Sequence, residues 1–174
     1  TLKTLLGKVR SRTKVDFSQY KEPTLWRRIE RRMAANHVST LLDYLQVVDQ
    51  TPVELDKLCK DILISVTAFF RDTDAFARLE RVVADILASK QPGDDIRVWV
   101  AGCATGEEAY SLAILFSERL GASFDQYRLQ IFATDSDLDA MALARRGVYS
   151  ASSLAHMDRG RIRANFTPHG DRYE

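Results

Sequence analysis

The sequence predicts an α/β protein in which a helical bundle precedes a βαβ unit. Three observations support this class: apolar residues recur at helical spacing over the first 72 residues, two short apolar runs follow at 96–101 and 129–134, and a small-residue loop and a helix separate those runs. The carboxyl ends of such parallel strands meet at one edge, where open α/β sheets bind ligands. We expect a helical domain over 1–70 and part of an α/β domain over 71–174.

The composition is that of a folded protein and excludes several classes. Of the 174 residues, 45% are hydrophobic and 28% are charged, unlike disordered or collagen-like chains. The net charge of +1 gives no overall field that attracts nucleic acid or an anionic membrane. No apolar run reaches the roughly 18 residues of a membrane span, and Cys59 and Cys103 have neither disulfide-framework nor metal-ligand spacing. We expect a cytoplasmic protein with no metal site and no membrane insertion.

The helical half, residues 2–72, also carries helix-start signals. Pro23 suits a first helical turn, Ser39 is a candidate N-cap, and the segment TPVE at 51–54 combines an N-cap, a proline and a capping-box glutamate. The apolar positions are Leu2, Leu5, Leu6, Val9, Leu25, Ile29, Met33, Leu41, Leu45, Val48, Leu55, Leu58 and Ile62.

The second half begins with another amphipathic helix, after which the periodicity changes. The turn chemistry of QPGDD ends that helix, and the next apolar run is rich in β-branched residues. The expected elements are a helix over 76–87, a turn at 91–95, a strand over 96–101, a loop over 102–106, a helix over 107–120, a strand over 129–134 and a helix over 137–145 that stops at Gly147.

The loop after the first strand is one candidate site. Gly102 lets the backbone approach a ligand closely, and the following helix start offers free amide groups. Glu107 and Glu108 disfavour the pyrophosphate of a dinucleotide, and they favour a cationic cofactor such as S-adenosylmethionine. The structural alternative is a capping box formed by Thr105 and Glu108.

Asp135 follows the second strand directly. An acidic residue at this place in nucleotide-binding α/β folds accepts hydrogen bonds from ribose hydroxyls. Alternatively, Ser136 and Asp139 form a capping box, and Asp135 is simply a solvated residue before a helix.

A basic patch lies on the helix that contains RRIERRM. Arg27, Arg28, Arg31 and Arg32 share one side of it, opposite the apolar positions. A solvated face, an acidic protein partner and nucleic acid are the three interpretations, and the scarcity of interleaved aromatic residues argues against stacking on single strands.

The segment 66–72, VTAFFRD, joins the two halves. The two phenylalanines suit a core or a seam between domains, whereas Arg71 is placed to hold a carboxylate in a partly dry cleft. Pairing of Arg71 with Asp72 or Asp74 is the structural alternative.

These motifs together resemble the CheR-type chemotaxis receptor glutamate methyltransferases. The resemblance rests on VTAFFRD at 66–72, GCATGEEAYS at 102–111 and FATD at 132–135, with RRIERRM at 27–33 upstream and GVY at 147–149 downstream. It covers nearly the whole chain. The sequences of these motifs are most similar to the methyltransferase segment of proteins that fuse this enzyme to a methylesterase and to sensory domains.

The resemblance implies a Rossmann-like S-adenosylmethionine-binding domain after the helical domain, and methyl esterification of glutamate side chains on chemoreceptors or similar acidic signalling helices. It implies that Arg71 lies near both the cofactor and the acceptor, and that the arginine-rich helix meets the acidic methylation region. Carried over by position, the cofactor-binding residues are Ser65, Thr67, Arg71, Gly102, Glu108 for the methionine portion and Asp135 for the ribose; the docking residues are Arg27, Arg28, Arg31 and Arg32.

The chain departs from the family in length. Later cofactor-binding asparagines and a tyrosine near the acceptor have no counterpart before Glu174, and the chain begins with Thr1 rather than Met. We therefore expect an α/β domain that is incomplete at its C-terminus, which alone binds cofactor weakly and fails to methylate. The alternatives are a non-catalytic cofactor-binding or receptor-docking module and, third, a nucleic-acid binder that uses the basic helix.

Overall fold

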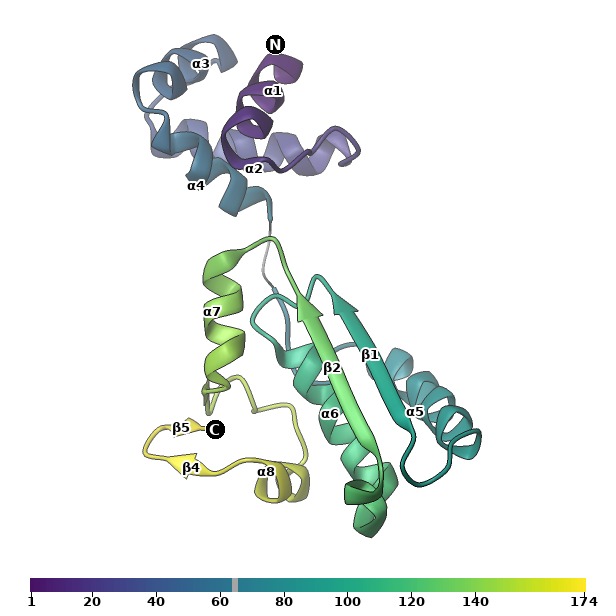
Figure 1. Ribbon diagram of the computed structural model, residues 1–174. Helices are drawn as coiled ribbons and strands as arrows, with labels where there is room; N and C mark the ends of the chain where they lie inside the picture. The colour runs from purple at the N-terminus through teal and green to yellow at the C-terminus, as the bar shows by residue number, and fades with distance from the viewer. Residues whose placement is uncertain (64–65) are drawn as a thin grey trace. The chain divides into compact units, whose positions relative to one another are not determined.

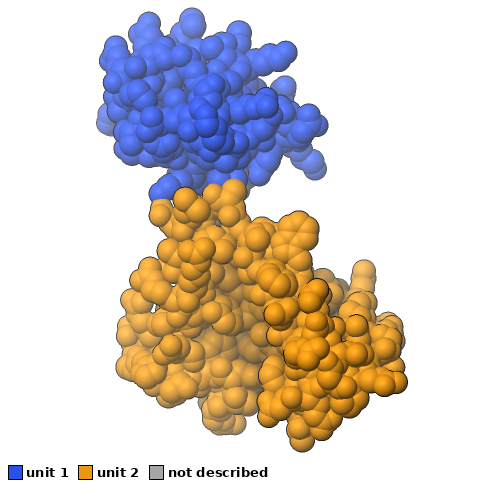
Figure 2. All heavy atoms as spheres, viewed as in Figure 1, with its two compact units in different colours: residues 1–64 blue, residues 65–174 orange. Residues whose placement is uncertain are grey.

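The structure, a computed structural model, describes residues 1–63 and 66–174 and divides the chain into two compact units. Unit 1 comprises residues 1–64 and unit 2 comprises residues 65–174 (Figure 2). The sequence placed this boundary after Phe70. The two phenylalanines belong to unit 2 because Phe69 is buried there, with its ring edge-on to Tyr149 and Phe166 at 4.9 and 5.4 Å between centroids.

Unit 1 is the expected helical bundle. Its buried side chains include Leu5, Leu25, Ile29 and Leu58, which come from the apolar positions that recur at helical spacing in the sequence. The helices are α1 Leu2–Thr13, α2 Glu22–Ala35, α3 Leu41–Gln50 and α4 Val53–Ile62 (Figure 1).

The helix starts differ in detail from the sequence expectation. Pro23 does lie in the first turn of α2. The N-cap of α3 is Thr40 rather than Ser39, because the Thr40 hydroxyl accepts the backbone N–H of Asp43. At α4 the N-cap position is Pro52, which makes no side-chain capping bond, so the capping box predicted at 51–54 is wrong.

Glu54 is instead the centre of a buried polar network in unit 1. Its side chain is 2% exposed and accepts two hydrogen bonds from Arg32 at 2.7 and 2.8 Å. The Tyr44 hydroxyl and the Asn36 amide donate two more, at 3.0 and 2.9 Å. Burial alone would raise the pKa of Glu54, but these hydrogen bonds hold it below its ordinary value. Burial raises the pKa of Tyr44, which therefore remains a donor.

Unit 2 contains the expected βαβ unit. Strands β1 and β2 pair in parallel from Asp95 opposite Arg128 to Ala101 opposite Thr134. Helices α5 and α6 cover one face of this two-stranded sheet, with Val83, Leu115 and Phe116 packed on it (Figure 1). The elements are α5 Thr73–Ala88, β1 Asp95–Ala101, α6 Glu107–Leu120, the 3₁₀ helix η1 Gly121–Gln126, β2 Arg128–Thr134 and α7 Leu138–Arg146.

The other face of the sheet carries exposed aromatic residues. Trp99 is 70% exposed and Phe132, its partner across the two strands, is 52% exposed. The indole N–H of Trp99 donates to the hydroxyl of Thr134 at 3.0 Å. The alternation of buried and exposed residues along β1 and β2 follows from the two-residue period of a strand with one covered face.

The last part of unit 2 forms a small antiparallel sheet that the sequence did not predict. Its strands are only two residues long and pair in the order β3-β5-β4, too short for an alternating pattern to be visible. These elements are β3 Tyr149–Ser150, α8 Arg159–Asn165, β4 Pro168–His169 and β5 Arg172–Tyr173. Over the described residues, no helix has the length and apolar character needed to cross a membrane.

Candidate functional site

The candidate site lies where β1 and β2 end together. The carbonyl of Thr134, the last residue of β2, accepts the backbone N–H groups of Gly102 and Cys103 at 2.8 and 3.0 Å. The parallel register therefore brings the loop after β1 beside Asp135, which follows β2. The sequence predicts that the loop after β1 and Asp135 meet at this edge of the sheet, and they do.

Asp135 binds the backbone of two loops. Its Oδ2 accepts the N–H of Ala104 and its Oδ1 accepts the N–H of Asp137, both at 2.8 Å. Ala104 has a φ of 47°, a left-handed conformation that a residue with a side chain adopts only when its surroundings hold it. Asp135 is thus neither a solvated residue before a helix nor a group with both oxygens free.

The capping box proposed for α7 is wrong. Asp137, rather than Ser136, is the N-cap, and its carboxylate accepts the N–H groups of Asp139 and Ala140 at 3.0 and 3.1 Å. Ser136 is exposed. A purely structural role for Asp135 would therefore rest on its own hydrogen bonds to the two loops and not on a capping box.

The start of α6 also lacks the predicted capping box. Gly106 occupies the N-cap position with a φ of 99° and supplies no side chain, while the Thr105 hydroxyl bonds to the buried Glu107 carboxylate. Glu108 is exposed, and no hydrogen bond reaches its carboxylate within the part of the chain that the structure describes. Its carboxylate is thus accessible in the first turn of a helix beside the loop.

The site is electrostatically negative. Burial raises the pKa of the Cys103 thiol, and the charges of Asp135, Glu108 and Glu107 raise it further. One buried atom thus senses three carboxylates from both strand ends, and this set suits a ligand with a sulfonium or ammonium group better than a phosphate. Gly102, at a φ of 73°, has open space where a Cβ would stand, so the backbone is approachable there.

The segment 66–72 is fixed to the same helix. The N–H of Phe70 donates to the Ser111 hydroxyl at 3.0 Å, and that hydroxyl donates to the carbonyl of Glu107 at 2.6 Å. Arg71, the next residue, is therefore held near the first turn of α6, which also carries Glu108. Of the other two residues predicted here, Thr67 is half-buried, and Ser65 lies outside the described residues.

Arg71 is exposed, and one of its Nη atoms donates to the Val66 carbonyl. No ion pair joins it to Asp72 or Asp74 among the described residues, so that structural alternative is not realised. The other guanidinium donors can meet an acidic group.

Two tyrosines to which no role was assigned from the sequence support the site. The Tyr149 hydroxyl donates to the carbonyl of Thr105 at 2.8 Å, and the Tyr110 hydroxyl donates to the carbonyl of Ala144 at 3.0 Å. Burial raises the pKa of both phenols, so they stay protonated. Tyr149 lies in the GVY motif and Tyr110 in the GCATGEEAYS motif, and these motifs were the available signals.

The basic helix of unit 1, α2, does not expose all four arginine side chains to solvent. Arg27 and Arg31 are exposed and Arg28 is half-buried, whereas the Arg32 side chain is 18% exposed and bound to Glu54. The inclusion of Arg32 among the docking residues is therefore corrected, because its guanidinium is committed within unit 1. Docking through the other three stays a prediction.

The fold and the site define an α/β cofactor-binding unit preceded by a helical unit. Residues 65–174 match the family described as "CheR methyltransferase, SAM binding domain", and residues 1–63 match "CheR methyltransferase, all-alpha domain". The chain belongs to the CheR methyltransferase family, which confirms the resemblance inferred from its motifs. S-adenosylmethionine, the cofactor that this domain's description names, fits the acidic loop site.

Three relatives illustrate the similarity. A protein of Rhodobacter capsulatus described as "Uncharacterized 104.1 kDa protein in hypE 3'region" is 41% identical over 91% of this chain and 17% of its own length. "Chemotaxis protein methyltransferase 2" of Pseudomonas aeruginosa is 32% identical over 83% of this chain and 50% of its own. "Chemotaxis protein methyltransferase" of Listeria innocua is 30% identical over 92% of this chain and 59% of its own. The chain therefore spans less than two thirds of each of these relatives.

Proposed function

We propose that this chain carries the cofactor-binding and acceptor-orienting part of a protein-glutamate O-methyltransferase that acts on chemoreceptors or similar acidic signalling helices. The observation that carries the proposal is the meeting of Asp135, Glu108 and the Gly102 loop at the ends of two parallel strands, with Arg71 held at the start of the same helix. Family membership and the names of the relatives support the same activity.

The arrangement separates two kinds of charge recognition. Glu108 and Asp135 provide the negative side chains that would hold the cofactor's ammonium group and ribose, while Arg71 provides the positive fork that would orient an incoming carboxylate. When bound, S-adenosylmethionine supplies an electrophilic methyl group on a positively charged sulfur. Thr67 and Ser65 would add contacts from the segment before Arg71.

The main requirement of this reaction is that the protein positions the acceptor carboxylate relative to the methyl group. A glutamate carboxylate, with an ordinary pKa of about 4.3, is ionised at neutral pH and needs no general base. Holding it in line with the methyl group can supply about 7 to 11 kcal/mol through proximity and orientation. Arg71 therefore has to aim the acceptor without binding it so tightly that attack is suppressed.

Methyl transfer from radiolabelled cofactor to a chemoreceptor cytoplasmic fragment tests this function, with the full-length gene product as enzyme. The label should be released as volatile methanol on mild base treatment, because carboxyl esters hydrolyse under those conditions and N-methyl groups do not. Glu108→Gln should weaken S-adenosylhomocysteine binding without lowering thermal stability. Asp125 is an exposed acidic residue in η1, and Asp125→Asn should change neither the binding nor the thermal stability. Base-stable label, or no transfer at all with cofactor still bound, would point instead to another acceptor or to a docking module without turnover.

The remaining alternative is nucleic-acid binding through the helix that carries Arg27 and Arg31. Its affinity would fall steeply with the logarithm of salt concentration, whereas cofactor binding should respond little. A titration with duplex and single-stranded oligonucleotides at two salt concentrations separates the two.

A further inference from the structure

The turn that carries Arg71 contains backbone conformations that need external support. Phe70 has a φ of 49° and Asp72 a φ of 59°, both in the left-handed region. For a bulky residue such as phenylalanine this conformation is a genuine outlier and is strained. Contacts from elsewhere in unit 2 must therefore stabilise it.

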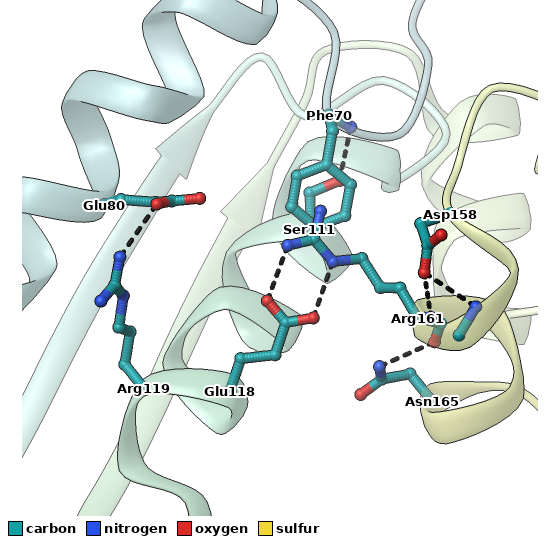
Figure 3. A network of polar contacts seen from close by, with 9 residues as sticks. Phe70, Glu80, Ser111, Glu118, Arg119, Asp158, Arg161 and Asn165 are labelled. Carbon is teal, nitrogen blue, oxygen red and sulfur yellow. Dashed lines mark hydrogen bonds and ion pairs between the residues drawn. The ribbon is translucent and has the colours of Figure 1, made fainter.

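Phe70 is held at its backbone and at its ring. Its N–H donates to the Ser111 hydroxyl on α6, and its ring lies 5.0 Å from the ring of Phe76 on α5. The guanidinium carbon of Arg161, on α8, lies 4.1 Å from the centroid of the Phe70 ring (Figure 3). A cation at this distance from an aromatic face is attracted by the ring's quadrupole.

Arg161 is itself fixed in orientation. Its Nε and Nη2 donate to the two carboxylate oxygens of Glu118, both at 2.7 Å, in the bidentate geometry that a planar guanidinium allows (Figure 3). Its backbone is anchored as well, because Asp158 accepts its N–H at 3.1 Å and its carbonyl accepts the Asn165 amide at 2.9 Å. The side chains of Arg161 and Glu118 are 26% and 36% exposed, so the pair is only partly screened by solvent.

We propose that Arg161, oriented by Glu118, is a positioning residue that holds Phe70 in its left-handed conformation and thereby directs Arg71 into the methyl-transfer site. The proposal rests on the function proposed above for Arg71. It assigns to α8 a role in the geometry of the reaction.

The proposal depends on the planar fork of arginine. Lysine would keep the positive charge at position 161 but could neither bind both oxygens of Glu118 nor stack a flat group on Phe70. A role in net charge alone would therefore tolerate Arg161→Lys, and a positioning role would not.

The chain offers a matched control on the same helix. Arg119, the neighbour of Glu118, pairs with Glu80 of α5 at 2.9 Å, with side chains 45% and 40% exposed. This pair also joins α6 to another helix (Figure 3). Within the described residues, no hydrogen bond or ring contact links Arg119 or Glu80 to Phe70.

The test compares Arg161→Lys, Arg161→Gln and Glu118→Gln with Arg119→Gln in the full-length gene product. Turnover, the KM for the acceptor, S-adenosylhomocysteine affinity and hydrogen exchange at the Phe70 amide are measured for each. We expect both Arg161 variants to lower kcat about tenfold, since a loss of about 1.4 kcal/mol in orientation has that effect, and to speed exchange at Phe70. Glu118→Gln should give a smaller effect of the same kind, and Arg119→Gln should change neither quantity.

Amide exchange reports on the turn whether or not the protein methylates, so the two proposals fail separately. A wild-type protein that binds no cofactor would contradict the proposed function. Hydrogen exchange at the Phe70 amide would still show whether Arg161 holds the turn. Wild-type turnover and exchange in Arg161→Lys would overturn the positioning role. Equal losses in Arg161→Gln and Arg119→Gln would likewise overturn it, because they would indicate general stabilisation of α6.

Discussion

The Oδ2 atom of Asp135 lies 2.8 Å from the backbone nitrogen of Ala104, although the two residues are 31 positions apart. This bond joins the loop after β1 to the end of β2. Asp135 therefore shapes the candidate site in addition to any bond it makes with a ligand, and its removal has two effects that must be separated.

We expect Asp135→Ala to lower stability and cofactor affinity together, because two backbone N–H groups lose their acceptor at a cost of about 1 kcal/mol each. Asp135→Asn keeps a single carbonyl oxygen and should lose about half of that stability. Thermal unfolding and calorimetric titration with S-adenosylhomocysteine measure both quantities. Ser136→Ala, at the exposed next position, is the control and should match the wild type; unchanged affinity in Asp135→Ala would remove this residue from the cofactor site.

The glycines of the loop should respond differently to alanine. At Gly102 an added Cβ meets no heavy atom within 4 Å, so Gly102→Ala should cost only about 1 kcal/mol of backbone strain. We nevertheless expect about tenfold weaker cofactor binding, because the methyl group would stand where backbone meets ligand. Gly93→Ala is a matched control, since Gly93 also has a positive φ and open space but lies before β1, at the opposite end of the sheet.

Gly106→Ala should instead damage the fold. Its Cβ would lie 2.9 Å from both the Ala144 Cβ and the Tyr149 hydroxyl oxygen, at a φ of 99°. We expect a loss of more than about 2 kcal/mol from overpacking and strain, measured by denaturant unfolding. A free energy of unfolding equal to that of Gly102→Ala would contradict this difference in packing.

Arg71 and Arg31 should give distinct kinetic signatures. Arg71→Ala should lower kcat by about tenfold or more at saturating acceptor, because it removes the group that aims the carboxylate. Arg31→Ala should raise the acceptor's KM and reduce its salt dependence, since exposed charges interact within a Debye length of about 10 Å at 0.1 M salt. Steady-state kinetics at two ionic strengths distinguish these outcomes, and equal effects on kcat would refute the assignment of separate roles.

The Glu54 network makes the stability of unit 1 depend on pH. The folded-state pKa of Glu54 is lowered, so its contribution is present above the unfolded-state value of about 4.3 and is lost as the pH falls through the lower folded-state value. Glu54→Gln should cost about 3 kcal/mol at neutral pH, because it removes the carboxylate that binds Arg32 through two hydrogen bonds and leaves Asp61, 3.8 Å away, as the nearest opposite charge. It should also flatten the acid limb. Circular dichroism of urea unfolding between pH 3 and 7 measures this. Arg12→Gln, which breaks the more exposed pair with Asp56, should have little effect.

Sequence periodicity predicted the helices of unit 1 and both strands of the parallel sheet, because each has one buried face and a regular spacing. It placed Gly102 and Asp135 at one edge for the same reason. The sequence did not reveal which polar residues serve the fold. Arg32 has the local appearance of a surface arginine, and only the approach of Glu54, 22 positions away, makes it a buried partner.

The supporting contacts of the site could not be predicted for a related reason. The bonds from Tyr149 to Thr105 and from Phe70 to Ser111 span 44 and 41 positions, so no local pattern encodes them. Capping boxes were overpredicted because Ser, Thr, Asp and Glu at the right spacing are common, whereas the bond that forms depends on which group the fold brings nearest. The small sheet of β3, β4 and β5 escaped prediction because two-residue strands have no periodicity.

The exposed indole of Trp99 makes the chain suited to spectroscopy. The sequence has two tryptophans: Trp26 packs against the core of unit 1, and Trp99 stands on the open sheet face of unit 2. Replacing Trp26 with phenylalanine leaves a single tryptophan in unit 2, and replacing Trp99 leaves a single tryptophan in unit 1. The Trp26 emission should shift to the red when unit 1 unfolds, whereas Trp99, already solvated and bonded to the residue before Asp135, should respond to occupancy of the neighbouring loop. Two intrinsic signals can thus follow the two units independently in one sample series, without an added dye.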